Sequence, residues 1–240
     1  MNPFGAATRG HGRPDLAEQL ALACRMLAYE GLFDQSGHVS VRRPETGQVL
    51  IHPHSTPRLD VRAEDLVTID LDGRLVEGDQ PPPSELFIHT RIYRARPDVQ
   101  AVVHAHSRMA TVFGIAGVDI VPVTNNATLL GPGPVPTYPD PRLVRSPQQG
   151  DALARMLGQG RACVMRNHGS VVVGSSLRDA FVAALFLEEN ALRQHLALQI
   201  GRPSGFTQQE MADMAGVYDE RPLQKTWDHY VSRARHAGLA

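Results

Sequence analysis

Cysteine, net charge and long apolar runs are all scarce in this sequence of 240 residues. Its two cysteines, Cys24 and Cys163, lie in apolar patterns without the close spacing of a zinc knot or redox pair, which predicts buried free thiols in a reducing compartment. A formal net charge of −1 offers no strongly basic surface for nucleic acid. Because no apolar run reaches membrane-spanning length and the first residues lack a signal-peptide core, we expect a soluble cytoplasmic protein that contacts no membrane.

Hydrophobic residues make up 42% of the chain, enough for one sizeable core. We therefore predict a flexible N-terminus at residues 1–14 and a single domain at residues 15–240. The segment 124–145, rich in proline and poor in periodicity, is predicted to be an ordered surface loop with a functional role.

The spacing of apolar residues predicts both helices and strands. Helical spacing, with capping residues at the ends, is found at residues 15–31, 85–96, 109–116, 146–157, 176–199, 207–210 and 221–237. Short β-type runs are found at residues 38–42, 48–52, 66–70, 102–106, 118–123, 162–165 and 171–173. Short strands joined by turns and interspersed with helices predict a mixed α/β fold, with a mainly antiparallel sheet flanked by helices.

Three histidines and one glutamate have the chemistry of a metal site. His104 and His106 are two residues apart in an apolar strand, so their side chains point to the same face. His168 follows another strand, and Glu85 follows three prolines at the start of a helix. A single strand histidine is more often a satisfied core or surface residue. The set of three, with a carboxylate oxygen to complete it, favours a divalent cation site.

The order of several motifs resembles the class II aldolase/adducin family from about Leu16 to about Gly201. The motifs are Gly37-His38-Val39-Ser40, Ile51-His52-Pro53, Pro83-Ser84-Glu85, His104-Ala105-His106-Ser107 and Asn167-His168-Gly169. The resemblance implies a three-layer α/β/α fold and a cyclic homotetramer with active sites between subunits. It also implies zinc or manganese, with iron or cobalt as alternatives, held by His104, His106 and His168, and an acid/base role for Glu85.

The sequence departs from the family's sugar-phosphate aldolases where they bind phosphate. Positions that carry an Asn, a Thr-Gly pair and two serines in those enzymes read His38, His54-Ser55 and Pro83-Ser84 here. Proline has no N–H, and losing the glycine removes a close backbone approach, so the anion cradle is altered. The tyrosine that those aldolases use as proton donor is also missing from residues 108–116, and Tyr138 is near only in sequence.

The prolines before Glu85 and the segment Phe87-Ile88-His89-Thr90 instead resemble the branch that decarboxylates hydroxylated aromatic dicarboxylates. We therefore predict a metal-dependent carboxy-lyase whose partner is a small-molecule carboxylate, with Glu85 as proton donor and His54 as second candidate. Arg58 or His52 is expected to hold a second carboxylate. The predicted substrate-binding residues are His38, Ser40, His52, Ser55, Arg58 and Ser84, and the residues predicted to support the site are His89 and Asn167.

Other interpretations of the same residues remain open. An aldolase of a sugar or sugar phosphate is the first, a non-catalytic adducin-like binding domain the second, and a dehydratase, epimerase or iron oxygenase the third. Retention of the three histidines and Glu85 argues against a binding domain, because a scaffold does not need a metal site. Arg58 could also be a solvated surface arginine, and Ser84 could serve only as a helix cap.

Overall fold

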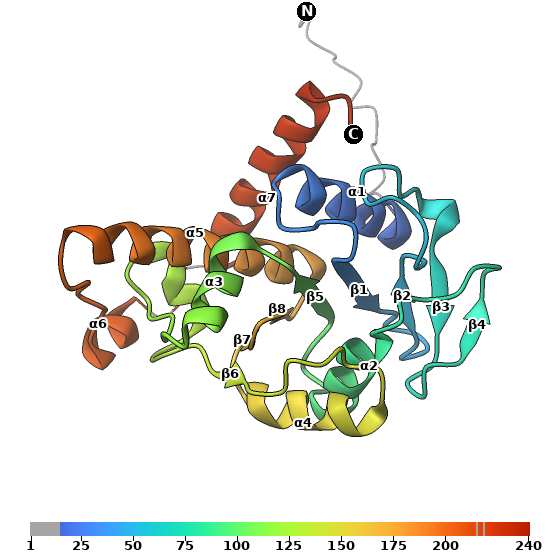
Figure 1. The fold of residues 1–240 in the computed structure, drawn as a ribbon. Coiled ribbons are helices and arrows are strands. Elements are labelled where there is room, and N and C mark those ends of the chain that lie inside the picture. The colour runs from blue at the N-terminus through green and yellow to red at the C-terminus, as the bar shows by residue number, and fades with distance from the viewer. Residues whose placement is uncertain (1–14, 215, 218) are drawn as a thin grey trace, which may run out of the picture.

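An eight-stranded mixed sheet forms the centre of the fold (Figure 1). The structure is a computed structural model that describes residues 15–214, 216–217 and 219–240, so the flexible N-terminus expected at residues 1–14 lies outside the described residues. The strand order is β4-β3-β2-β1-β5-β8-β7-β6. All neighbouring strands are antiparallel except β6 and β7, as a mainly antiparallel sheet requires. The strands are β1 (His38–Arg42), β2 (Val49–Ile51), β3 (Val67–Ile69), β4 (Leu75–Glu77), β5 (Ala101–Ala105), β6 (Thr137–Tyr138), β7 (Ala162–Met165) and β8 (Gly169–Gly174).

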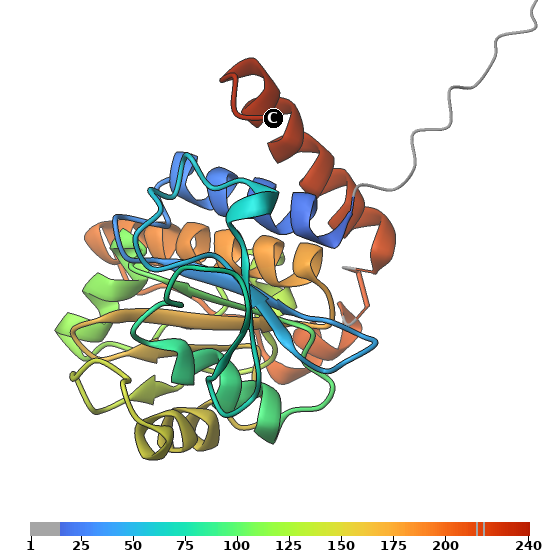
Figure 2. The same cartoon turned by 90° about the vertical axis from the view of Figure 1, so that its right-hand side faces the viewer.

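Helices cover both faces of this sheet and make three layers, α/β/α (Figures 1 and 2). On one face lie α1 (Leu16–Tyr29), α3 (Arg108–Ala116), α5 (Leu177–Ile200) and α7 (Glu220–His236). On the other lie α2 (Leu86–Ala95) and α4 (Pro147–Leu157). The remaining helical segments are η1 (Ala63–Asp65), η2 (Asn125–Leu130) and α6 (Gln208–Asp213).

Side chains alternate between the two layers along β5. Val103 packs into the core beneath α1 and α5, whereas Val102 packs into the core beneath α2 and α4. His104, two residues after Val102, therefore lies on the α2 side of the sheet. The register pairs His104 with His38 of β1, so both side chains lie on that same face.

The helix ends follow the capping residues of the sequence. Ser146 caps α4 ahead of a proline, and Ser176 caps α5. Asp15 and Thr207 each form a capping box, at α1 and α6. These side chains accept hydrogen bonds from backbone N–H groups that would otherwise lack a partner. The residues close to each helix start therefore predict where the helix begins.

The strand predicted at residues 118–123 is wrong. Two buried amide side chains of α5 take the backbone hydrogen bonds that a neighbouring strand would have made. Asn190 accepts from the N–H of Val123 and donates to the carbonyl of Val121, and Gln194 accepts from the N–H of Val121. The segment is thus satisfied by side chains distant in sequence, which no local pattern could reveal.

The loop predicted at residues 124–145 is ordered but contains the short elements η2 and β6. β6 has two residues and lies parallel to β7, and β4 is an exposed edge strand of three residues. The sequence did not predict either strand, because β6 is too short for alternation and all three residues of β4 are exposed, which leaves no buried face.

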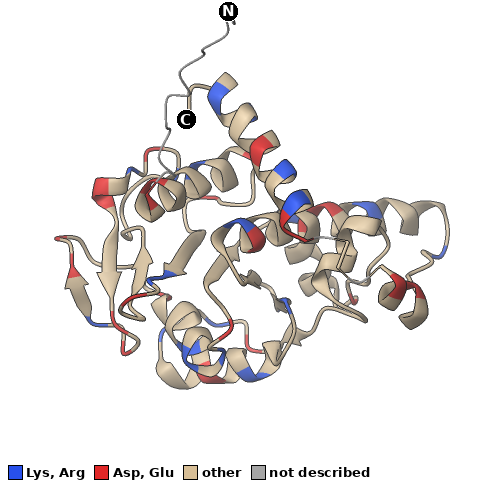
Figure 3. Ribbon diagram, turned by 180° about the vertical axis from the view of Figure 1, so that it is seen from behind, with Lys and Arg blue, Asp and Glu red and all other residues tan. Residues whose placement is uncertain are grey.

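The surface carries charges of both signs. Figure 3 shows acidic and basic residues interspersed along the outer helices, in keeping with the net charge of −1. Among the described helices, none combines the length and the hydropathy that crossing a bilayer would demand.

Candidate metal centre

Glu85, His104, His106 and His168 converge at one end of the central strands. One ligand atom from each side chain lies within 4.8 Å of the other three, and Glu85 and His104 are buried. They come from the start of α2, the end of β5, the residue just after it, and the turn between β7 and β8. Residues far apart in sequence thus form a set of three imidazoles and one carboxylate, a donor set suited to zinc or manganese.

Hydrogen bonds at Nδ1 orient two of the histidines. Nδ1 of His104 lies 3.0 Å from the carbonyl oxygen of Ser170, and Nδ1 of His106 lies 3.1 Å from a carboxylate oxygen of Asp34. Both acceptors lack a proton, so each Nδ1 carries the hydrogen and each Nε2 keeps its lone pair. The two Nε2 atoms lie 3.2 Å apart, and two facing lone pairs at that distance favour a cation between them.

His168 supports the same fit. Both of its ring nitrogens are buried without a hydrogen-bond partner among the described residues. Its Nε2 lies 3.4 Å from Oε2 of Glu85. Buried polar atoms are rarely left unpaired, and a metal ion bound at Nε2 would give that nitrogen a partner. The described residues therefore fit a divalent ion held by His104, His106 and His168, with Glu85 beside it.

The turn that presents His168 depends on the two residues flanking it. Asn167 has a φ of 57°, the only positive φ of a residue other than glycine in the described chain. A Cβ at Gly169 would lie 2.4 Å from the carbonyl oxygen of Ala105, so a larger residue would push β8 away from β5. The side chain of Asn167 is exposed, so its support for the site comes through the backbone.

Glu85 is held by both the histidines and a loop. Its Oε1 accepts a hydrogen bond of 2.8 Å from the backbone N–H of Val144. Burial alone would raise the pKa of this carboxyl group, but the contact with His168 and the hydrogen bond from the N–H of Val144 lower its pKa below the usual value. Glu85 is therefore a carboxylate at neutral pH.

A buried chain of hydrogen bonds leads away from the centre. Nδ1 of His38 lies 2.6 Å from Nε2 of His89, and Nδ1 of His89 lies 2.6 Å from the hydroxyl of Ser40. That hydroxyl lies 2.9 Å from the hydroxyl of Tyr93, which donates to the carbonyl of Ser40. Glu85, His89 and Tyr93 are spaced by four residues, so α2 turns all three toward the sheet. Both ring nitrogens of His89 are thus engaged by His38 and Ser40, so His89 supports His38 and not Glu85 by hydrogen bonding.

The buried imidazoles are uncharged. Burial lowers the pKa of His104 to about 3 and holds the pKa of His38 and of His89 well below the usual value, and neighbouring imidazoles act in the same direction on each. Burial, followed by the charge of Arg58, lowers the pKa of His52 to about 3. Neutral imidazole is the form that binds metal, so His104 needs no deprotonation before it binds a cation.

A cavity of about 350 Å³ opens beside the centre. Its lining residues are Gln35, Ser36, His38, His54, Arg58, Pro83, Ser84, Glu85, His106, Leu143 and Arg145. Most of these residues come from four loops, which precede β1, follow β2, precede α2 and precede α4. The metal site lies at the cavity wall through Glu85 and His106.

The predicted substrate-binding residues divide into those at the cavity and those behind it. His54 and Ser84 are exposed and line it, and Ser84 does not cap α2, whose N-cap is Glu85. Ser55 is exposed but does not line the cavity, and His52 is fully buried. Arg58 lines the cavity while buried, so it is not a solvated surface arginine.

Sequence reasoning missed several residues that the structure brings to the site. Asp34 orients His106, the carbonyl of Ser170 orients His104, and the N–H of Val144 binds Glu85. Arg145 lines the cavity from the segment predicted to be a functional loop. Backbone groups carry no sequence signal, and nothing local distinguishes Asp34 from other surface carboxylates.

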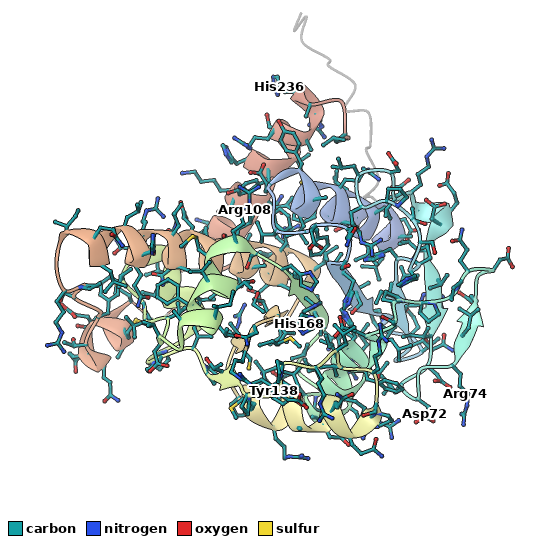
Figure 4. All side chains as sticks on the ribbon, in the orientation of Figure 1. Asp72, Arg74, Arg108, Tyr138, His168 and His236 are labelled. Carbon is teal, nitrogen blue, oxygen red and sulfur yellow. The ribbon has the colours of Figure 1, made fainter. Side chains whose placement is uncertain are left out.

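Asp34 provides a test of the metal centre. Replacing Asp34 with alanine removes the acceptor that fixes the ring of His106, so we expect zinc affinity to fall about 10- to 100-fold. Zinc dissociation constants from competition with a chelating dye measure the effect. Asp72→Ala, at an exposed site on the far edge of the sheet (Figure 4), should bind zinc as the parent does. Equal affinities in all three proteins would remove Asp34 from the site.

Comparisons with known proteins place the chain in one family. Residues 18–195 match the family described as Class II Aldolase and Adducin N-terminal domain. The chain is 32% identical to the 3,4-dihydroxyphthalate decarboxylase of Arthrobacter keyseri over 233 residues, which cover 90% of this chain and 92% of that protein.

Aldolases are similar as well. The chain is 33% identical over 195 residues to the 5-methylthioribulose-1-phosphate/5-deoxyribulose-1-phosphate aldolase of Rhodospirillum rubrum, covering 79% of this chain and 80% of that one. A solved structure of L-fuculose 1-phosphate aldolase superposes with a TM-score of 0.79 at 25% identity, covering 86% of this chain and 97% of the other. In sequence, the similarity to the decarboxylase extends over more of the chain than the similarity to the Rhodospirillum rubrum aldolase.

Proposed function

Because this chain belongs to the class II aldolase and adducin family and has its three-histidine, one-glutamate site, we propose that this lyase is a decarboxylase of a hydroxylated aromatic carboxylic acid. One observation carries the choice: the cavity beside Glu85 is lined by His38, His54 and Pro83, where aldolases of the family bind phosphate. The similarity to 3,4-dihydroxyphthalate decarboxylase supports it.

A bound divalent ion, zinc or manganese by its donor set, would supply Lewis acidity for the negative charge that develops as CO₂ leaves. Hydrogen bonds to Ser170 and Asp34 keep His104 and His106 in the tautomer that binds such an ion. The buried chain behind His38 fixes the orientation of that ring at the cavity wall.

Glu85 is the residue we assign to proton transfer. It is ionised before substrate arrives, so it must take up a proton before it can give one to the ring carbon, and the ring hydroxyl of the substrate can supply that proton. Glu85 can take the proton of the ring hydroxyl and return it to the carbon that loses CO₂, which leaves the product as a phenolate that water reprotonates. His54, exposed at the cavity wall, is the second candidate for this transfer.

The alternative is an aldolase, which the 33% identity to the Rhodospirillum rubrum enzyme favours. Two observations argue against it. Helix α3, where the family's aldolases carry the tyrosine that donates a proton, contains no tyrosine here. Tyr138 lies against α4 (Figure 4), where its hydroxyl reaches the carbonyl of Gln149 at 3.5 Å. Pro83 also has no N–H to offer a phosphate.

Assembly into a homotetramer is part of the proposal. Exposed apolar side chains recur on the outer helices, at Ile115 (63% exposed) and Ile200 (92% exposed). Burying such side chains against other copies of the chain would stabilise the assembly.

A substrate panel tests the function. Protein loaded with zinc, manganese, cobalt or iron is incubated with ortho-hydroxylated aromatic acids and with sugar phosphates, and CO₂ and aldehyde products are measured. We expect CO₂ from at least one aromatic acid, no cleavage of sugar phosphates, and no activity in chelator-treated protein. Retro-aldol cleavage of a sugar phosphate without CO₂ release from any acid would make the aldolase the better assignment.

A further inference from the structure

Two arginines, Arg58 and Arg145, line the cavity beside the metal centre, and they differ in their contacts. Each guanidinium nitrogen of Arg58 donates to a backbone carbonyl: Nε to Gly37 at 2.7 Å, Nη1 to Thr56, and Nη2 to His54 at 3.4 Å. These bonds tie together the loops on either side of β1 and β2. The donors of Arg58 are thus largely used in shaping the cavity wall, and His52, the other predicted carboxylate ligand, is fully buried behind it.

Arg145 is exposed and lines the same cavity, and its guanidinium has no ion-pair or hydrogen-bond partner within the described chain. Nearby arginines differ in this respect. Arg142 forms an ion pair with Asp140, with nitrogen and oxygen 2.7 Å apart. Arg166 donates to the carbonyl of Pro139 at 2.7 Å. Arg145 is therefore the cavity cation with donors available for a ligand.

The backbone around Arg145 is fixed relative to the metal centre. The N–H of Val144 donates to Oε1 of Glu85 at 2.8 Å, and the N–H of Arg145 donates to the side chain of Gln149 at 3.0 Å. Arg145 therefore follows directly after the residue that binds the acid/base carboxylate. Leu143, 41% exposed, lines the same cavity and offers apolar surface to a ring.

We propose that Arg145 binds the carboxylate that the substrate retains, and so makes the site specific for aromatic dicarboxylic acids over monocarboxylic ones. The planar guanidinium can pair with a carboxylate through two parallel N–H bonds. Leu143 packs on the ring between that carboxylate and Glu85. The inference rests on the proposed function for the identity of the substrate, and it assigns to Arg145 the role predicted from sequence for Arg58 or His52.

A matched pair of ligands and a matched pair of variants test this inference. Zinc-loaded protein is titrated calorimetrically with 3-hydroxyphthalate and with salicylate, which differ only by the second carboxylate. We expect the parent to bind 3-hydroxyphthalate at least about tenfold more tightly, the size of one charge-assisted contact. Arg145→Ala should abolish this preference. Arg145→Lys should keep part of it, because lysine keeps the positive charge but cannot form the two parallel N–H bonds. Arg142→Ala, three residues away on the same loop, should behave as the parent.

The inference requires that the preference for the dicarboxylic acid disappears in Arg145→Ala and remains in Arg142→Ala. If Arg145→Ala keeps it, if Arg142→Ala loses it equally, or if the parent shows no preference, the assignment is wrong. Calorimetry reports binding and not turnover, so CO₂ release is measured separately on the same samples. Failure to release CO₂ with the preference intact would count against the decarboxylase and leave the carboxylate site in place.

Discussion

Replacing Glu85 with glutamine is expected to lower kcat at least about 100-fold on whichever acid the protein decarboxylates, while substrate and zinc affinity change little. The amide has nearly the shape of the carboxylate, and its oxygen can still accept the N–H of Val144, so the loop carrying Arg145 stays in place. What is lost is the group that takes and returns a proton. Steady-state kinetics with the zinc content of each sample measure the effect.

Two further variants make this result specific. Glu77→Gln, at an exposed edge strand where Glu77 pairs with Arg43, should turn over as the parent does. Glu85→Ala should lose both turnover and the hydrogen bond to Val144, so its KM for a dicarboxylic acid should rise as well. A Glu85→Gln variant as fast as the parent would remove Glu85 from proton transfer and leave His54 as the candidate.

Loss of one histidine should abolish stable metal binding. We expect His104→Ala and His106→Ala to lower zinc affinity by more than about 100-fold, because zinc sites rarely hold with fewer than three protein ligands. The parent should carry about one zinc per chain, and a variant with His104, His106 and His168 all replaced by alanine should carry none after dialysis. Elemental analysis of the dialysed proteins measures this.

The choice of variants separates metal loss from misfolding. His104 is fully buried, so its replacement leaves a cavity in the core, whereas the side chain of His106 is 21% exposed and can be removed with less disturbance. His229→Ala, at an exposed position on α7, is the control and should keep its zinc. Stoichiometric zinc in the triple variant would show that zinc binds elsewhere on the protein.

Local patterns predicted most of the elements that carry the site. The alternation at His104 and His106 placed both on one face, and the capping residues at Asp15, Ser146 and Ser176 marked helix starts where the structure has them. These features depend on residues close in sequence. The strand predicted at residues 118–123 failed because Asn190 and Gln194, about 70 residues away, satisfy its backbone.

The sequence by itself determined the chemistry of this protein: three imidazoles and a carboxylate, in motifs that resemble one family, with the aldolases' phosphate-binding groups replaced. Only the tertiary structure decided which groups are available to a ligand. Arg58 and Arg145 are the same kind of residue in the sequence, and both line the cavity. The carbonyls of three separate residues occupy the guanidinium of Arg58, whereas no described residue pairs with the guanidinium of Arg145. Hydrogen bonds to backbone atoms leave no trace in residue identity, so availability becomes visible only when the chain is folded.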